Sequence, residues 1–315
     1  MKQIVSLLSL LLCTAIVSSC SLFGTPDPLA QRLSEHRLST STGITQGQSF
    51  SAPSAVVSWF DIPYAQPPVG DLRWRAPREL QAPEQIIVER DDTSCVQKAS
   101  RYAGVSGEGM VGSEDCLYLD IKAPADFASR NYPVMLWIHG GGNTSGLKDY
   151  YQYDKLVARK DVVVVAVNYR LGALGWFTHP AIQDLQQGLD KTSNFGLLDI
   201  IESLKWVQQN IARFGGDPSN VTIFGESAGG HNVLALLASP QAQGLFHKAI
   251  SQSGYTQEVS ARDAYNKNGA NSLIARGSWQ ITNKLVDRPQ SEYSPQQLRS
   301  VLKAIDAIEF MSLYR

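Results

Sequence analysis

The sequence predicts an α/β fold, in which a mostly parallel, doubly wound sheet is accompanied by a small sheet near the N-terminus. Three stretches carry this prediction. Residues 162–167 are almost all valine, which is typical of a strand buried on both faces of a parallel sheet. Residues 194–214 have apolar side chains at three- and four-residue steps, the period of a helix. Residues 221–224 form the next predicted strand, so strands and helices alternate along the chain.

The N-terminal third contributes the small sheet. Residues 43–92 alternate short apolar stretches with proline and glycine, and residues 56–60 are β-branched and aromatic enough to form a strand. Residues 63–77 are rich in proline, which excludes regular structure because proline lacks the backbone N–H. We therefore expect a loop over the main domain here.

The remaining elements follow in order. Residues 117–121 and 134–138 are apolar and predict two strands. An apolar helical run at 233–237 follows the strand at 221–224, and residues 249–253 predict the next strand. Residues 263–312 have helical periodicity. Along the chain, the expected sheet therefore has one strand before the helix at 233–237 and another strand after it.

A Gly-x-Ser-x-Gly motif lies between the strand at 221–224 and the helix that follows it. It consists of Gly225, Ser227 and Gly229. Strand, tight turn and helix are the context of a nucleophile elbow, which lifts the serine hydroxyl above the end of the sheet. It also directs the first N–H groups of the helix at whatever the serine attacks. The alternative is a Gly/Ser turn that merely opens a helix, and a second motif upstream disfavours it.

That second motif is a glycine loop directly after the strand at 134–138. His139 is followed by Gly140, Gly141 and Gly142. Loops of this type supply backbone N–H donors to an oxyanion, and a Cβ would block the approach of the backbone to the substrate. A flexible glycine turn is the alternative. The two motifs together, in this order, predict acyl-transfer chemistry.

The N-terminus has the features of an export signal. Lys2 supplies a positive charge, and residues 4–17 are mostly apolar but too short to span a bilayer. Small residues then precede Cys20, which predicts a lipoprotein-type signal peptide over residues 1–19 and lipidation of Cys20. A plain secretory peptide is the alternative. Residues 20–40 are expected to be a flexible tether. The protein is thus expected in the bacterial cell envelope, at the outer membrane or periplasm of a Gram-negative host.

The combined motifs resemble those of the type-B carboxylesterases, which have the α/β-hydrolase fold. The resemblance runs from about residue 40 to the end. It implies that Ser227 is the nucleophile and that Gly141, Gly142 and Ala228 supply the oxyanion N–H groups. The motifs that carry it are residues 60–68, 114–119, 139–142, 168–172, 194–199, 214–218 and 225–229.

Further pairings follow from the resemblance and from residue type. With Cys13 and Cys20 in the leader, Cys95 and Cys116 remain, and two cysteines in an exported protein favour one disulfide over two buried thiols. The resemblance implies the same pairing. It also implies an ion pair between Arg73 and Glu114, for which two solvated charges are the alternative.

Three further features come from residue type and from the family pattern. Asp199 is a plausible structural partner of Arg170. Asn143 stands after the glycine loop, where the family commonly has an aromatic residue. No tryptophan lies between Cys95 and Cys116, which argues against cholinesterase activity.

A serine nucleophile needs a base, and the base usually needs an orienting carboxylate. Only His231 and His247 follow Ser227, and their places in the predicted elements favour structural roles. No catalytic acid or histidine is therefore identified. We expect residues 41–315 to be a C-terminally incomplete α/β-hydrolase domain that lacks the family's last strands.

The predicted function is hydrolysis of a small-molecule carboxylic ester through a Ser227 acyl-enzyme, with low or no activity in a chain without the acid and histidine. The alternatives are a non-catalytic surface-adhesion protein of the same fold, or a lipase or thioesterase. The formal net charge is −1 and no basic stripe is present, so nucleic acid is not an expected partner. No metal or other cofactor is implied, and membrane contact is expected only through the lipid anchor.

Overall fold

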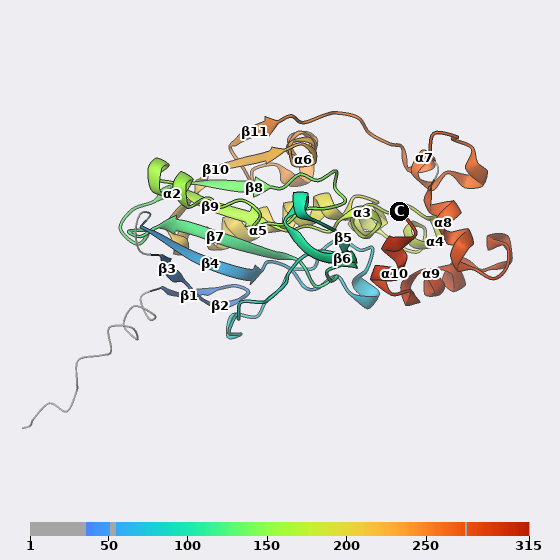
Figure 1. Cartoon of the computed structure of the whole chain (residues 1–315), viewed down its shortest axis with the longest axis horizontal. Helices are drawn as coiled ribbons and strands as arrows, with labels where there is room; N and C mark the ends of the chain where they lie inside the picture. Colours follow the sequence, from blue (N-terminus) through green and yellow to red (C-terminus); the bar gives the residue numbers. More distant parts are fainter. Residues whose placement is uncertain (1–35, 51–54, 275, 315) are drawn as a thin grey trace, which may run out of the picture.

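The computed structural model describes residues 36–50, 55–274 and 276–314. Its centre is a seven-stranded sheet with the order β11-β10-β8-β9-β7-β4-β3 (Figure 1). The predicted strands are all present, with small shifts at their ends. In chain order the strands are β3 (Gln48–Phe50), β4 (Val56–Pro63), β7 (Tyr118–Pro124), β8 (Tyr132–Ile138), β9 (Val163–Val167), β10 (Gly216–Glu226) and β11 (Lys248–Gln252).

The sheet is mixed. The pairs β8–β9, β8–β10 and β10–β11 are parallel, whereas β3–β4, β4–β7 and β7–β9 are antiparallel. The α/β fold is confirmed, but only three of the six strand pairs are parallel, whereas a mostly parallel sheet was expected. Parallel neighbours need a long crossover, which here contains α2 (Asp154–Lys160), α5 (Phe195–Asn210) or α6 (Ala228–Ala238). Strands β3 and β4 are close in the sequence and pair antiparallel.

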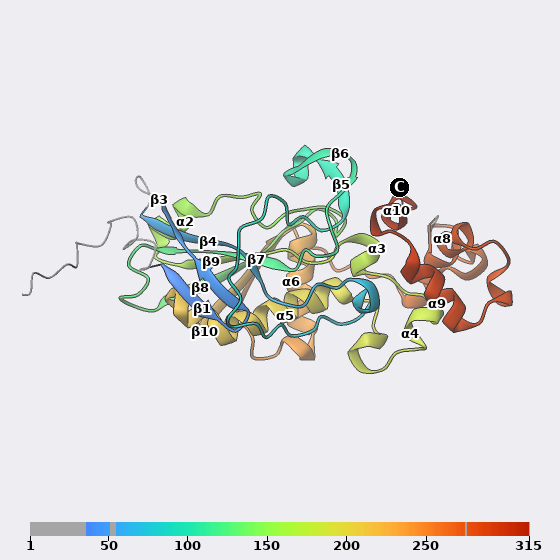
Figure 2. The same cartoon turned by 90° about the horizontal axis from the view of Figure 1, so that it is seen from below.

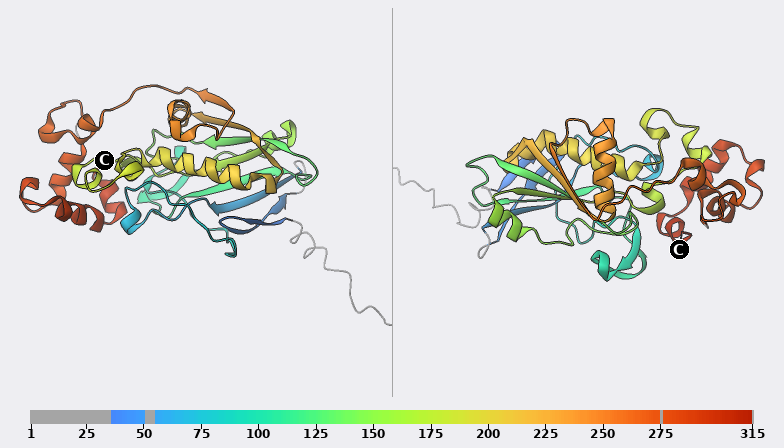
Figure 3. Two further views of the ribbon diagram at one scale, coloured as in Figure 1. Left: turned by 180° about the vertical axis from the view of Figure 1, so that it is seen from behind. Right: turned by 90° about the horizontal axis from the view of Figure 1, so that it is seen from above.

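Helices cover both faces of the sheet. Strand β9 shows the two faces, because Val163, Val165 and Val167 belong to the main core, while Val164 packs in a separate cluster with Val157 of α2. Helices α5 and α6 contribute apolar side chains to the main core and therefore share one face. In Figure 3, left, α5 lies along the strands of this face.

Two small sheets stand apart from the central one. Strands β1 (Arg37–Thr40) and β2 (Gly43–Gln46) form a small N-terminal sheet, as expected. The strand predicted at residues 56–60 does not belong to it, because β4 pairs with β7 in the central sheet. The tether expected up to residue 40 must end earlier, since β1 begins at Arg37 and Thr40 is buried. The signal peptide and Cys20 lie outside the described residues.

The second small sheet is a hairpin of β5 (Gln97–Ser100) and β6 (Val105–Val111), which the sequence analysis did not anticipate. Its β6 strand, with its glycines and mostly exposed side chains, lacks the apolar alternation that marks a strand.

Short helices gather at one end of the molecule, as the red segments in Figures 1 and 2 show. The helical structure expected within residues 263–312 is confirmed, and it consists of several separate helices. A second apolar core lies here, in which the ring of Trp74 stacks on Phe177 with centroids 4.6 Å apart. The helices are α3 (Gly172–Gly175), α4 (Pro180–Gln183), α7 (Ala261–Tyr265), α8 (Ser278–Leu285), α9 (Pro295–Ala304) and α10 (Ala307–Ser312).

The covalent and ionic links expected from the sequence are present. Cys95 and Cys116 form a disulfide. Arg73 lies 2.5 Å from Glu114 and also donates to the carbonyl of Ile305 at 2.6 Å, which ties the helical end to the sheet domain. In the described part of the chain, no helix has the length and apolar character needed to cross a bilayer.

The second predicted ion pair is buried. Arg170 donates to both carboxylate oxygens of Asp199 at 2.8 and 2.7 Å, and both side chains are almost fully shielded from solvent. This two-point geometry fixes the segment after β9 against α5.

Candidate active site

Ser227 occupies a sharp turn between β10 and α6. Its φ and ψ of 55° and −119° lie in a region that side-chain-bearing residues rarely adopt. The flanking glycines make this turn possible. A Cβ at Gly229 would lie 2.0 Å from the carbonyl oxygen of Ile138, and one at Gly225 would lie 2.6 Å from the backbone of Gly229. The motif thus forms the tight strand-to-helix turn that the sequence predicts.

The backbone of the turn is held from both sides. The N–H of Ser227 donates to the carbonyl of Gln252 in β11 at 2.9 Å, and the carbonyl of Ser227 accepts from the N–H of His231 at 2.9 Å. Since β10 and β11 are parallel, the end of β11 lies beside the turn. These bonds keep the serine in its strained conformation.

The glycine loop lies directly against this turn. Strands β8 and β10 are parallel neighbours with Ile138 opposite Gly225, so the residues after both strands meet at one edge of the sheet (Figure 1). A Cβ at Gly140 would lie 2.7 Å from the carbonyl oxygen of Glu226 and 3.3 Å from the Cβ of Ser227. Only glycine permits this approach.

Three backbone N–H groups around Ser227 have no acceptor among the described residues. They belong to Gly141, Gly142 and Ala228, the residues expected to form the oxyanion site. The two glycines have φ of 96° and 64°, which turns the loop sharply. The carbonyl of Gly141 accepts from the N–H of Ser145 at 3.0 Å. Unengaged N–H groups at a helix start are suited to a developing negative charge.

His139 makes structural contacts within the core. Its ring stacks on Tyr169 with centroids 4.3 Å apart, and the Tyr169 hydroxyl donates to the His139 carbonyl at 2.6 Å. Burial lowers the pKa of His139 to about 4, so the ring is neutral at pH 7. Its Nδ1 lies 2.9 Å from the carbonyl oxygen of Gly140, and since a carbonyl only accepts, Nδ1 carries the proton.

The two histidines after Ser227 also make structural contacts. The Nδ1 of His231 bonds the carbonyl of Tyr255 at 2.6 Å, and the two rings stack. The Nδ1 of His247 accepts from the N–H of Val221 at 3.1 Å, at the start of the apolar part of β10. Within the described residues, no imidazole or carboxylate hydrogen-bonds the Ser227 hydroxyl.

The segment that follows the glycine loop is held by residues that were not predicted from the sequence. Gln97 of β5 clamps Gly146, donating to its carbonyl at 2.9 Å and accepting from its N–H at 2.8 Å. Two residues on, the buried Lys148 lies 2.8 Å from Asp61 and 2.9 Å from Asp120. No local pattern marks these contacts, because each joins residues far apart in the chain.

The charges in this buried cluster are strongly perturbed. Burial raises the pKa of Asp120 to about 6, while Lys148 and the N–H of Asp61 act in the opposite direction. Burial disfavours the charged form of Lys148, but the carboxylates of Asp120 and Asp61 outweigh it and raise its pKa. The cluster thus holds Lys148 as a cation beneath the loop. It does not contact Ser227 in any hydrogen bond of the described chain.

A cavity of about 610 Å³ opens beside the glycine loop. It includes Gly142 and Asn143, and its apolar lining comes from Met110, Trp176 and Met311. An apolar cavity beside an oxyanion site can receive the acyl or the alcohol half of an ester.

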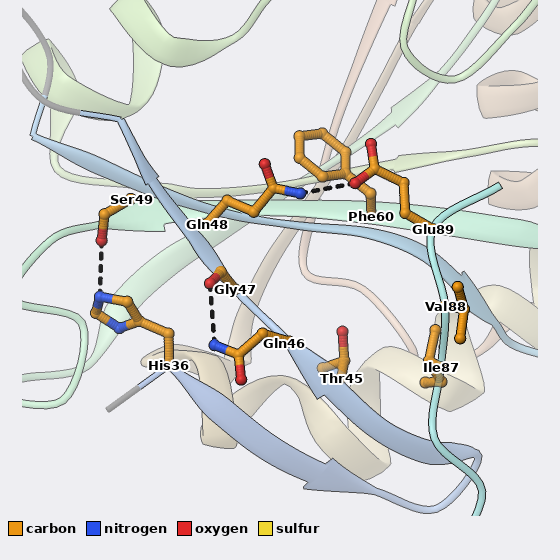
Figure 4. A pocket seen from close by; sticks show the side chains of 10 residues that line it. All are labelled: His36, Thr45, Gln46, Gly47, Gln48, Ser49, Phe60, Ile87, Val88 and Glu89. Carbon is orange, nitrogen blue, oxygen red and sulfur yellow. Dashed lines mark hydrogen bonds between the residues drawn. The ribbon is translucent and has the colours of Figure 1, made fainter. Parts of the chain in front are cut away.

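A second cavity, of about 600 Å³, lies by strands β2 and β3 (Figure 4). Several of its polar side chains are bonded to one another, as Gln48 is to Glu89 at 2.6 Å and His36 to Ser49 at 2.7 Å. Ser227 lines neither cavity, but Gly142 of the glycine loop lines the first one and no residue of that loop lines the second. The described residues contain no cluster of histidine, cysteine and acidic side chains that could hold a metal ion.

Comparison with known proteins places these features in a family. A family profile described as "Carboxylesterase family" matches residues 34–313. The chain is 42% identical to a para-nitrobenzyl esterase of Bacillus subtilis over 69% of this chain and 44% of that protein. It is 40% identical to a fumonisin B1 esterase of Sphingopyxis macrogoltabida over 76% of this chain and 44% of that protein.

Solved structures give the same result. A thermophilic PNB esterase superposes with a TM-score of 0.71 at 35% identity, covering 88% of this chain and 53% of that one. A carboxylesterase of Geobacillus stearothermophilus has a TM-score of 0.70 at 32% identity, covering 88% and 54%. The chain therefore spans about half the length of the relatives it matches. Fold, motifs and matches agree that the chain belongs to the type-B carboxylesterase family of α/β-hydrolases.

Proposed function

We propose that this chain carries the nucleophile and oxyanion site of a carboxylic ester hydrolase. The observation that supports the proposal best is the juxtaposition of the strained Ser227 with the three unengaged N–H groups of Gly141, Gly142 and Ala228. A serine in this setting attacks a carbonyl carbon, and the N–H groups stabilise the negative charge that develops on the carbonyl oxygen. In comparable sites one such donor contributes about 3–4 kcal/mol to the transition state.

The reaction has two halves. The Ser227 oxygen bonds to the carbonyl carbon, the ester C–O bond breaks, and the alcohol leaves with a proton. Water then attacks the acyl-enzyme, releasing the carboxylic acid and restoring the serine. Each half requires a base to take a proton. Because the described residues place no imidazole or carboxylate in contact with the Ser227 hydroxyl, we expect acylation by reactive probes to exceed turnover.

The proposed substrates are small-molecule carboxylic esters. The names of the relatives support this class, since they include a para-nitrobenzyl esterase and a liver carboxylesterase. The cavity beside Gly142, with the apolar side chains of Met110, Trp176 and Met311, suits an apolar half of such an ester.

The test uses a fluorophosphonate probe and a short-chain p-nitrophenyl ester with three proteins: the unaltered chain, Ser227→Ala and Ser239→Ala. Ser239 is a matched serine at the other end of α6. We expect labelling of the unaltered chain and of Ser239→Ala, and none of Ser227→Ala. Labelling that persists in Ser227→Ala would refute the assignment of the nucleophile. A folded, unlabelled wild-type chain would instead favour a non-catalytic, surface-adhesion role.

We also propose that the protein is exported and anchored through a lipid on Cys20. Support comes from the short apolar stretch at residues 4–17 and the small residues before Cys20. In a bacterial host fed a labelled fatty acid, the chain should acquire label and partition with membranes, and Cys20→Ala should do neither. Membrane partition and labelling that survive in Cys20→Ala would contradict the anchor.

A further inference from the structure

Two asparagines face each other across the candidate site. Asn143 is the residue directly after the glycine loop, and Asn232 lies within α6. The Nδ2 of Asn232 donates to the Oδ1 of Asn143 at 2.9 Å, and the Nδ2 of Asn143 lies 3.4 Å from the Oδ1 of Asn232. The two side-chain amides therefore form a reciprocal pair between segments 89 residues apart.

Each asparagine of this pair lies close in the chain to a candidate oxyanion donor. Asn143 follows Gly142 without an intervening residue. Asn232 is four residues after Ala228, which places both on the same side of α6 one turn apart. The pair thus joins the loop that carries two of the three N–H groups to the helix that carries the third.

Asn143 is itself held firmly. The Tyr169 hydroxyl lies 3.3 Å from its Oδ1, and the N–H of Gly172 donates to its carbonyl at 2.6 Å. Its φ is 56°, a left-handed conformation that asparagine tolerates better than most residues. Asn232 is only 2% exposed, so its amide has no easy replacement partner in water. An aromatic side chain at position 143 could not make the amide bonds to Asn232.

We propose that the Asn143–Asn232 amide pair is a positioning element, which sets the distance between the glycine loop and the start of α6 and so aligns the N–H groups of Gly141, Gly142 and Ala228. This inference rests on the proposed function of those three groups. Oxyanion donors act only when they lie within hydrogen-bond distance of the oxyanion. A shift of about 1 Å in the relative position of catalytic groups can lower a rate about 100-fold.

The experiment compares four variants with the unaltered chain: Asn143→Ala, Asn232→Ala, the double variant and the control Asn210→Ala. Asn210 is a buried asparagine of α5 whose amide donates to the Ser41 hydroxyl and to the carbonyl of Trp206, neither of which belongs to the candidate site. It reports what the loss of any buried amide does to the fold. The measured quantity is the second-order rate constant for labelling of Ser227 by the fluorophosphonate probe.

We expect Asn232→Ala and Asn143→Ala each to lower this rate constant about 10- to 100-fold, and the double variant to fall no further than the worse single variant. Asn210→Ala should keep the rate constant within about twofold of wild type. Where an ester is turned over, the loss should appear in kcat rather than in KM, since the donors act on the transition state. Equal rate constants for Asn232→Ala and Asn210→Ala would overturn the proposal.

A second measurement does not depend on activity. Hydrogen exchange of the backbone amides in residues 139–146 should become faster in Asn232→Ala and stay unchanged in Asn210→Ala, because the loop loses its link to α6. A wild-type chain that takes no label would count against the proposed function, and the exchange result alone would then decide the amide pair. Unchanged exchange in Asn232→Ala would overturn it, whether or not the chain takes label.

Discussion

Replacement of Ser227 by glycine should stabilise the fold relative to replacement by alanine. The φ and ψ of 55° and −119° at this position cost a residue with a Cβ about 1–3 kcal/mol, whereas glycine adopts them freely. Glycine also gains entropy in the unfolded chain, which lowers stability by about 0.4–1 kcal/mol. Since the Ser227 hydroxyl makes no hydrogen bond in the described chain, alanine should resemble serine. The net expectation is that Ser227→Gly is about 1 kcal/mol more stable than Ser227→Ala.

Urea unfolding followed by tryptophan fluorescence measures this difference. Ser239 provides the matched control, because it has an ordinary extended conformation with φ and ψ of −86° and 118°. There glycine should be about 0.4–1 kcal/mol less stable than alanine. The sign of the Gly-minus-Ala difference should therefore be opposite at the two positions. If glycine is the less stable replacement at both, the turn stores no strain and the reasoning fails.

Three further predictions concern the supporting structure, and urea midpoints measure all of them. Replacing Cys95 and Cys116 by alanine should lower the unfolding free energy by about 3 kcal/mol. The difference between wild type and this double variant should disappear when both are assayed under reducing conditions. Arg170→Met leaves the buried carboxylate of Asp199 unpaired and should cost about 3–5 kcal/mol, whereas Arg170→Met combined with Asp199→Leu should cost much less. The pKa of His139 is lowered from 6.5 to about 4, so the stability that its neutral ring contributes is present above pH 6.5 and is lost as the pH falls toward 4. His139→Phe should therefore lose less stability than wild type between pH 7 and pH 5, and equal losses would contradict the buried neutral ring.

The parts of the fold that the sequence predicted well are those with a local cause. The valine-rich strand β9, the periodic helix α5 and the turn at Ser227 each depend on residues within one short stretch, so their composition is enough. The glycine loop belongs to the same group, because only glycine allows the backbone approach that the motif requires. The ion pair of Arg73 with Glu114 came from family resemblance rather than from any local pattern.

Other features were missed or only partly foreseen because their causes are distant in the chain. The antiparallel half of the sheet was not predicted, since the direction in which β4, β7 and β9 pair depends on how their connections run in space. The β5–β6 hairpin has little apolar alternation and is recognisable only through its pairing. The expected tether overlapped β1, which becomes a strand by pairing with β2.

The sequence by itself determined the family, the nucleophile candidate and the residues that could donate to an oxyanion, because a tight turn and a close backbone approach each demand particular residues at fixed spacing. Only the tertiary structure decided what holds these groups together. Parallel pairing of β8 and β10 brings Ser227 and the glycine loop to one edge of the sheet. The amides of Asn143 and Asn232 meet there across 89 residues of chain. Such contacts arise from the folded path of the backbone, and no spacing in the sequence encodes them.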